Sequence, residues 1–326
     1  MREKKVENRS REGRFRMQKK ILLAVDDSTP SRQAVDYVGR MKDLIRGLGV
    51  TLLHIQPPIS RFLLDEANLS GPAQAELKKV AARNAEASRG LLATYREVLI
   101  RAGMAEPAIE LATQPRNQGL AKDILDHAQN GLFDAILVGR RGISSVQQMF
   151  MGSVSAHLVE NSPVIPVWLV DGDVRSMRVM AAVDGSESAL RAVDHMAFML
   201  SGNPEVRVCF FHVAPRLKDY CEINFGAEAG DGLETLLAQG DRRCMDDFFP
   251  AALAKLREAG FRDDQVETRT ATTLLSVGET ILTAAREGGF GAIVMGRRGI
   301  NKSFFGGKVS YAVSHKLSDA ALWLVP

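Results

Sequence analysis

The chain has 326 residues, of which 45% are hydrophobic and 25% are charged, and its formal net charge is +3. This charge is too small to create the strong field by which a protein attracts nucleic acid or a membrane surface. At roughly 100–200 residues per domain, the length predicts two domains.

The first 16 residues differ in composition from the rest of the chain. They carry seven basic and three acidic residues and show no apolar periodicity, which predicts a disordered basic extension over residues 1–17. The extension lacks the apolar core of a secretory signal, and its acidic residues are not typical of a transit peptide. Two interpretations stay open: Met17 is the true start of the protein, or the basic arm is functional.

The cysteine content indicates a reducing compartment. The sequence contains Cys209, Cys221 and Cys244, an odd number without a Cys-x-x-Cys pair. That pattern excludes a disulfide framework and is typical of the cytosol. No apolar run approaches the roughly 18–20 residues that span a bilayer. We therefore expect a soluble, cytoplasmic protein.

In chain order, short apolar runs alternate with helical patterns through the first half. The predicted strands cover residues 21–25, 50–55, 108–113, 133–138 and 164–170. The predicted helices cover residues 30–46, 72–102, 117–130 and 152–160. Such alternation predicts parallel strands joined by crossover helices. All of the runs except the third are almost entirely apolar, which is typical of strands covered on both faces.

The second half repeats the first at a separation of 155 to 158 residues. The matched pairs are Asp26 and Asp184, His54 and His212, Gly139 and Gly296, and Trp168 and Trp323. The second set of predicted strands covers 179–183, 206–213, 266–272, 290–295 and 320–325, and the second set of helices covers 187–200, 233–259, 276–288 and 307–317. The chain is therefore an internal duplication, with domains over 18–171 and 175–326 and a short polar joint between them.

The predicted fold class is α/β, with two tandem doubly wound domains, each an open, Rossmann-like parallel sheet. In such sheets a ligand binds beyond the carboxyl ends of the strands, where the strand order reverses. Asp26, Ile55 and Gly139 each end or follow a strand. We therefore expect these three residues to lie at the ligand-binding edge of the first sheet.

A glycine segment, "GRRGISSVQQMFMGSVS", follows the fourth strand of the first half, from Gly139 to Ser155. Glycine lets a loop turn tightly while its amides approach a ligand. A helix begins near Gly152 and Ser153, and helix N-termini bind phosphate through unpaired N–H groups. The segment therefore suits a nucleotide polyphosphate, although a tight turn is the alternative. It matches neither the Walker loop nor the dinucleotide fingerprint.

The spacing Gly, two residues, Gly, nine residues, Gly-Ser resembles the ATP-binding motif of the universal stress protein (UspA-like) family. The segments "AVDDS", "AVDGS", "LLHI", "FFHV" and "PVWLV" also resemble that family. The resemblance covers nearly the whole chain and implies a tandem, two-domain family member. It further implies that the last strands of the two domains pair across a pseudo-twofold axis.

The resemblance also implies ATP-binding roles in the first domain. Asp26 and Ile55 would flank the adenosine, and the glycine segment would hold the ribose and phosphates. The implied residues of that segment are Gly139, Gly142, Gly152, Ser153 and Ser155. For Asp26 the alternative is an N-cap of the first helix, although Ser28 or Thr29 could cap it instead.

The second copy departs from the motif. Its matching positions are Asp184, Val213, Gly296, Gly299, Gly307, Lys308 and Ser310. Seven residues separate Gly299 from Gly307, two fewer than in the first copy, and Lys308 replaces Ser153. Lys308 either pairs with phosphate or faces solvent. The sequence leaves open whether the second domain binds nucleotide.

No catalytic residue is predicted. His54 and His212 are more typical of structural histidines, and neither copy offers an evident base to activate water. Asp26 and Asp27 could together hold Mg²⁺ beside phosphates, but the second copy keeps only the first of them, so no metal site is predicted. Arg140, Arg141, Arg297 and Arg298 are expected to reach phosphate, another subunit or solvent. Any ATP hydrolysis is expected to be slow.

The expected function is that of a stress-response protein in which ATP binding regulates contacts with an unknown protein partner. Two copies of the chain are expected to associate. The alternatives are an interaction module of the same fold that binds no nucleotide, and an adenylyl-transfer enzyme. The second alternative needs a further substrate pocket, for which domains of about 150 residues leave little room.

Overall fold

The computed structural model describes residues 19–140, 151–214, 216, 227–273, 276–298 and 307–326. The predicted extension over residues 1–17 lies outside the described residues, as do Gly142, Gly299 and Arg141. Every element below belongs to the described part of the chain.

The first half forms a five-stranded unit. Its strands are β1 (Lys19–Ala24), β2 (Leu48–Ile55), β3 (Ile109–Gln114), β4 (Ala135–Gly139) and β5 (Val167–Asp171). Its helices are α1 (Thr29–Leu44), α2 (Arg61–Leu69), α3 (Gly71–Arg101), α4 (Leu120–Asn130) and α5 (Ser153–Asn161). All nine predicted elements of this half are present, within a few residues of their predicted bounds.

The second half repeats this order. Its strands are β6 (Val179–Val183), β7 (Val208–Ala214), β8 (Val266–Thr272), β9 (Ala292–Gly296) and β10 (Ala320–Val325). Its helices are α6 (Glu187–Leu200), α7 (Ala227–Glu258), α8 (Val277–Glu287) and α9 (Lys308–Lys316). The internal duplication is thus visible in the fold.

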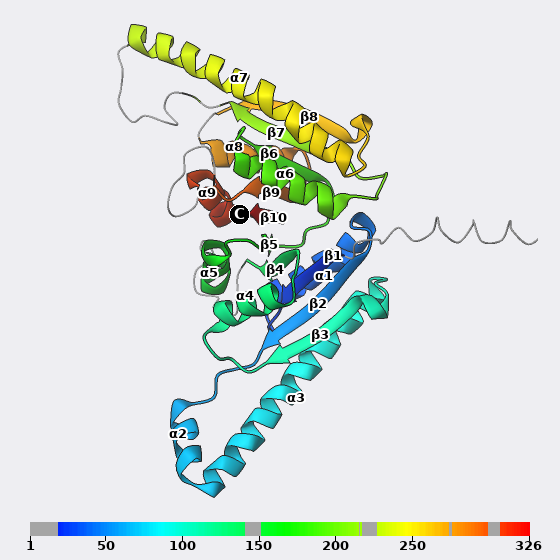
Figure 1. The fold of residues 1–326 in the computed structure, drawn as a ribbon, viewed down its shortest axis with the longest axis vertical. Helices are drawn as coiled ribbons and strands as arrows, with labels where there is room; N and C mark the ends of the chain where they lie inside the picture. Colours follow the sequence, from blue (N-terminus) through cyan, green and yellow to red (C-terminus); the bar gives the residue numbers. More distant parts are fainter. Residues whose placement is uncertain (1–18, 141–150, 215, 217–226, 274–275, 299–306) are drawn as a thin grey trace, which may run out of the picture.

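The strands form one sheet of ten, in the order β3-β2-β1-β4-β5-β10-β9-β6-β7-β8 (Figure 1). Pairing is parallel within each half and antiparallel between β5 and β10 at the centre. The strand order reverses between β1 and β4, and again between β6 and β9. The predicted doubly wound α/β class is confirmed, and β3 and β8 are the outer edges.

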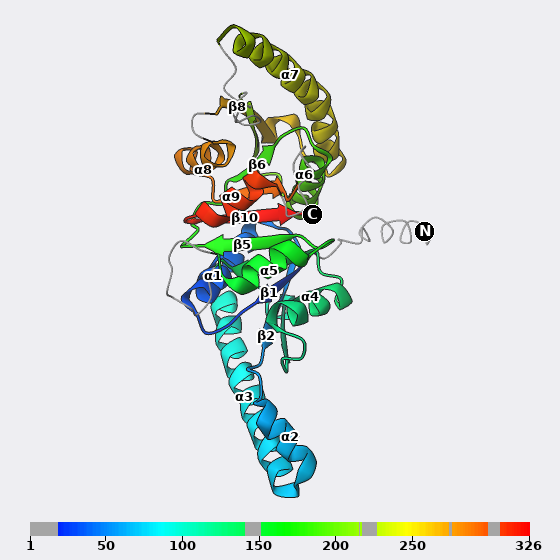
Figure 2. The same cartoon turned by 90° about the vertical axis from the view of Figure 1, so that its left-hand side faces the viewer.

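Two apolar layers cover the faces of the sheet. On one face, α1, α3, α6 and α7 bury a core that runs through both halves. On the other face, α4, α5, α8 and α9 bury a second core (Figure 2). Side chains alternate across a strand, so neighbouring residues of the central strands enter opposite cores. This explains why those strands read as continuous apolar runs.

The joint between the halves is built around two tryptophans. Trp168 on β5 lies opposite Trp323 on β10, and the two rings stack with centroids 3.6 Å apart. The Trp168 indole donates to His195 Nε2 over 3.1 Å, and the Trp323 indole donates to the Tyr37 hydroxyl over 3.1 Å. Tyr37 and His195 are matching positions of the repeat. The pairing of the two last strands, expected from the resemblance, is confirmed.

One helix was not predicted. The variable stretch after β2 contains α2, which forms a hairpin with α3 that extends away from the sheet (Figure 2). Prolines 57 and 58 end the preceding segment, and Ser70 caps α3 by accepting from the Ala73 amide. The apolar face of α2 is short and buries only Ala67 completely. A periodic signal this brief is hard to distinguish from a loop.

Candidate functional site

A cavity of about 290 Å³ lies at the carboxyl ends of β1, β2 and β4, at the point where the first sheet reverses its strand order. Its lining includes six of the seven predicted first-domain site residues: Asp26, Ile55, Gly139, Gly152, Ser153 and Ser155. The seventh, Gly142, lies outside the described residues. The structure therefore brings together residues that are up to 129 positions apart in the sequence.

Asp26 is held in place by two serines. Its Oδ1 accepts hydrogen bonds from the hydroxyls of Ser28 (2.5 Å) and Ser31 (2.6 Å). Ser28, not Asp26, caps α1, because its hydroxyl accepts from the Ser31 amide. The Tyr95 hydroxyl also donates to the Asp26 carbonyl. Asp26 is thus a positioned carboxylate at the cavity rather than a helix cap. Ser31 was not predicted; it lies five residues after Asp26, in the first turn of α1.

The first turn of α5 supplies amides to the cavity. Gly152 occupies the N-cap position of α5 and has no side chain to accept from that turn. The Gly152 amide itself donates to the Arg140 carbonyl over 2.9 Å. Amides at a helix start have no partner within the helix, and they favour an anion. The Ser155 hydroxyl donates to the Gly139 carbonyl, so it ties α5 to β4.

His54 also lines this cavity. Its Nδ1 lies 2.9 Å from the Ser88 hydroxyl, which donates in turn to the Asn84 carbonyl. That arrangement makes His54 Nδ1 the donor to Ser88. Burial lowers the pKa of His54, against the opposing effect of the Asp26 charge. The imidazole is therefore a neutral, oriented group, as expected for a structural histidine, but it lies at the cavity wall.

Gly139 has a packing role that the sequence did not reveal. A Cβ at this position would lie 2.7 Å from the backbone carbon and oxygen of Pro30, in the first turn of α1. Gly296 meets Ser188, the counterpart of Pro30, in the same way. Both glycines therefore permit close contact between a strand end and a helix, independently of any ligand.

We expect Gly139→Ala to lower the free energy of unfolding by about 1–3 kcal/mol, because its methyl group would overlap backbone atoms. Urea denaturation followed by circular dichroism measures the loss. Gly90→Ala is the matched control, since nothing lies within 4 Å of a Cβ at this helical position. Helix propensity makes that control neutral or stabilising by about 0.5–1 kcal/mol. Equal stability of Gly139→Ala and wild type would contradict the packing role.

The second-domain residues occupy matching places. Asp184 Oδ1 accepts from the Ser186 amide, Val213 is buried near the end of β7, and Gly296 ends β9. Gly307 is the N-cap of α9, Lys308 is exposed in its first turn, and Ser310 is buried with its hydroxyl bonded to the Arg297 carbonyl. Gly299 lies outside the described residues.

The surroundings of Asp184 differ from those of Asp26. Cys244 Sγ lies 3.8 Å from the Gly185 carbonyl, and a Cβ at Gly185 would lie 2.3 Å from this sulfur. His212 is buried, with its two ring nitrogens 3.0 Å from the Val183 carbonyl and 3.0 Å from Asp241. The two halves therefore share a backbone frame but differ in the polar groups around it.

The first arginine after each fourth strand crosses to the other domain. Arg140 is 1% exposed and donates to the His315 carbonyl near the end of α9. Arg297 donates to the carbonyls of Val159 and Ser162 at the end of α5. Of the alternatives predicted for these arginines, the structure supports contact with a neighbouring domain, here within one chain. Arg298 is exposed.

Two other kinds of site are absent from the described residues. No group of three or more histidine, cysteine or acidic side chains there could hold a metal ion. No helix in the same part of the chain has the length and apolar character needed to cross a membrane.

Comparisons with known proteins support the duplication. The model of the universal stress protein family matches residues 17–171 and again residues 176–321. A universal stress protein from Archaeoglobus fulgidus has a TM-score of 0.62 at 19% identity, over 94% of this chain and 97% of that one. A putative universal stress protein from Pseudomonas aeruginosa has a TM-score of 0.52 at 12% identity, over 95% and 93%. At these identities the likeness shows the fold alone.

Comparison with the curated proteins gave no match. The first family match contains all five strands of the first half, and the second contains β6 to β9 and ends within β10. The chain belongs to the universal stress protein family, with one domain of that family in each half.

Proposed function

We propose that the first domain binds ATP, or a related adenine nucleotide, in the cavity at the carboxyl ends of β1, β2 and β4. The observation that supports this most is the meeting of a positioned carboxylate, Asp26, with the uncapped first turn of α5 in one cavity. A carboxylate suits ribose hydroxyls, and free amides at a helix start suit phosphates. The main chain of Ile55 would contact the base.

The lining favours binding over rapid turnover. Of the described lining residues, Asp26 and His54 are the ones with ionisable side chains. Asp26 Oδ1 already accepts from two hydroxyls, and His54 is oriented by Ser88. We therefore propose a protein whose nucleotide occupancy regulates contacts with a partner, and which hydrolyses ATP slowly. Analysis of products after incubation with ATP tests the second part.

Gly152→Val is expected to weaken ATP binding by the first domain, with a loss of roughly tenfold or more in affinity. The branched side chain would crowd the amides that face the phosphates, and tenfold corresponds to about 1.4 kcal/mol. Equilibrium dialysis with labelled ATP measures the effect. Gly307→Val is the matched control, because Gly307 is the N-cap of α9 in the other domain.

Equal binding of ATP by wild type and Gly152→Val would contradict the assignment of the site. Nucleotide that stays bound to Gly152→Val and is lost in Gly152→Val/Gly307→Val would place a second site in the second domain. Mass spectrometry of the denatured, purified protein detects nucleotide that co-purifies with it. A wild-type chain that neither co-purifies with nucleotide nor binds ATP would favour the nucleotide-independent interaction module.

A further inference from the structure

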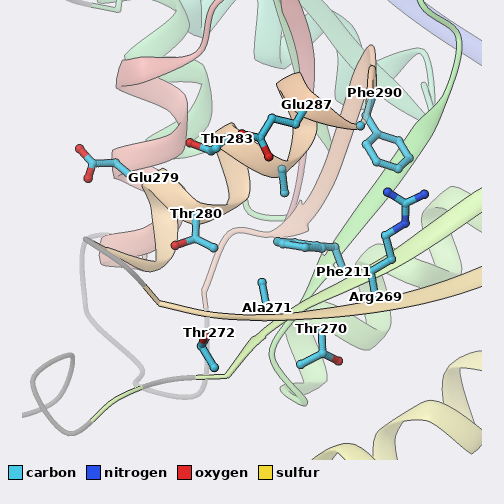
Figure 3. Close-up of a pocket in the computed structure, with 12 residues that line it drawn as sticks. Phe211, Arg269, Thr270, Ala271, Thr272, Glu279, Thr280, Thr283, Glu287 and Phe290 are labelled. Carbon is cyan, nitrogen blue, oxygen red and sulfur yellow. The ribbon is translucent and has the colours of Figure 1, made fainter.

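A second cavity, of about 470 Å³, lies in the second domain between α8 and the edge strand β8 (Figure 3). Phe211 and Phe290 are buried aromatic residues of its lining, which also contains threonines, two alanines, a glycine, two glutamates and Arg269. Its volume is within the range of roughly 300–1,000 Å³ that is usual for small-molecule sites. It shares one aligned position with the first-domain cavity, Phe211 for Leu53, and is otherwise lined by different positions.

This cavity exists because two alanines replace larger residues of the first domain. Strand register and helix bounds align Ala271 with Gln114 and Ala284 with His127. In the first domain, His127 Nδ1 lies 3.1 Å from Gln114 Oε1, and its ring stacks on Phe133. In the second domain both alanines line open space. The same fold therefore occurs once with this space filled by polar side chains and once with it open.

The charged groups of the lining are not equally compensated. Arg269 donates to Glu267 over 3.1 Å, and Lys316 donates to Glu279. Within the described residues, the Glu287 side chain has no hydrogen bond or ion pair. Glu287 is the last residue of α8, where the helix dipole disfavours a carboxylate. The cavity thus presents an exposed carboxylate without a protein partner among the described residues, while the other charges of its lining, Arg269 and Glu279, are paired.

The geometry places this charge where a ligand can meet it. Figure 3 shows Thr280 and Glu287 projecting from α8 over the strands that carry Phe211 and Ala271. Phe290 is already covered by two arginines, since the Arg178 and Arg269 guanidinium groups lie 4.5 Å and 5.6 Å from its ring centroid. Phe211 carries no such cation among the described contacts and remains the aromatic surface for a ligand.

We propose that this cavity binds a small organic cation with an apolar body, such as an arylalkylamine. The ammonium would pair with Glu287 and donate hydrogen bonds to threonine oxygens, and the apolar body would lie against Phe211. Both a carboxylate and an aromatic face attract an organic cation. This site is separate from the proposed nucleotide site and does not depend on it.

Isothermal titration of the full chain with phenethylamine tests the proposal. Phenylpropionate is the matched probe, because it has a similar aromatic body and the opposite charge. We expect phenethylamine to bind at one site, and phenylpropionate to bind roughly tenfold more weakly or not at all. No binding of phenethylamine, or tighter binding of phenylpropionate, would overturn the proposal.

Two variants locate the binding. Ala271→Gln/Ala284→His installs the pair that fills the same space in the first domain, and it should reduce phenethylamine affinity by roughly tenfold or more. Glu287→Gln keeps the shape of the cavity and removes the charge, so it should cause a similar loss. Thermal unfolding verifies that both variants fold. Unchanged affinity in either folded variant would refute the site, whereas Gly152→Val should bind phenethylamine as wild type does.

Discussion

Arg140→Met is expected to lower the free energy of unfolding by about 3–5 kcal/mol, the usual cost of removing one partner from a buried ion pair. Arg140 is 1% exposed, and the side chain of Asp171 is 13% exposed. Arg140 Nε lies 3.1 Å from Asp171 Oδ1, close enough for an ion pair although not aligned as a hydrogen bond. Methionine would fill much of the volume but would remove this cation from the largely buried Asp171 carboxylate.

The carbonyl groups at the end of α9 add to the loss. Arg140 Nη1 donates to the His315 carbonyl over 3.0 Å, and helix-terminal carbonyls have no partner within the helix. Urea denaturation of wild type, Arg140→Met, Asp171→Asn and the double variant forms a double-mutant cycle. The double variant should be more stable than the sum of the single effects predicts. A loss below about 1 kcal/mol for Arg140→Met would show that the crossing contact contributes little.

Arg140 and Arg297 also connect the contact between the two domains with the candidate ligand sites. The first turn of α5 faces the first-domain cavity, and the last turn of α5 receives Arg297 from the second domain. Arg140 holds the end of α9 in the reciprocal way. Each helix that begins at a candidate site is therefore anchored at its other end by the neighbouring domain. A contact of this kind explains why an arginine directly follows Gly139 and Gly296.

The local frame of the fold could be predicted from the sequence. Apolar runs and helical periods located 18 of the elements, and the constant repeat separation showed that the second half copies the first. The doubly wound topology then placed Asp26, Ile55 and Gly139 at one edge of the sheet. Those inferences depend on local pattern and on the general rule that relates strand ends to ligand sites.

Long-range packing could not be predicted in the same way. Nothing local shows that the Cβ of Gly139 would overlap Pro30, or that Arg140 reaches His315, because these contacts join segments far apart in the chain. The second-domain cavity was missed for a related reason. Alanine at positions 271 and 284 gives no signal in the sequence alone. The consequence of both alanines becomes visible only when strand register and helix bounds align them with Gln114 and His127.

His195 occupies the repeat position of Tyr37, and it makes the stability of the protein depend on pH. His195 is largely buried with its ring edge-on to the stacked tryptophans, and desolvation lowers its pKa from 6.5 to about 4, against the opposing effect of Asp194. Trp168 donates to its Nε2, so the folded state uses the neutral ring. Protonation of that nitrogen would remove the acceptor of the Trp168 indole.

Stability is therefore expected to fall as the pH falls from about 6.5 towards 4. Above this window His195 is neutral in both the folded and the unfolded chain, and its full contribution is present. Within the window the unfolded chain binds a proton that the folded chain rejects, which costs about 3 kcal/mol once the pH is below the folded pKa. Urea denaturation at several pH values measures this loss. His195→Gln keeps an acceptor for Trp168 without titrating, so subtracting its pH profile removes the contribution of every other group. The joint would not be the acid-sensitive element if wild type and His195→Gln lost stability in parallel over this range.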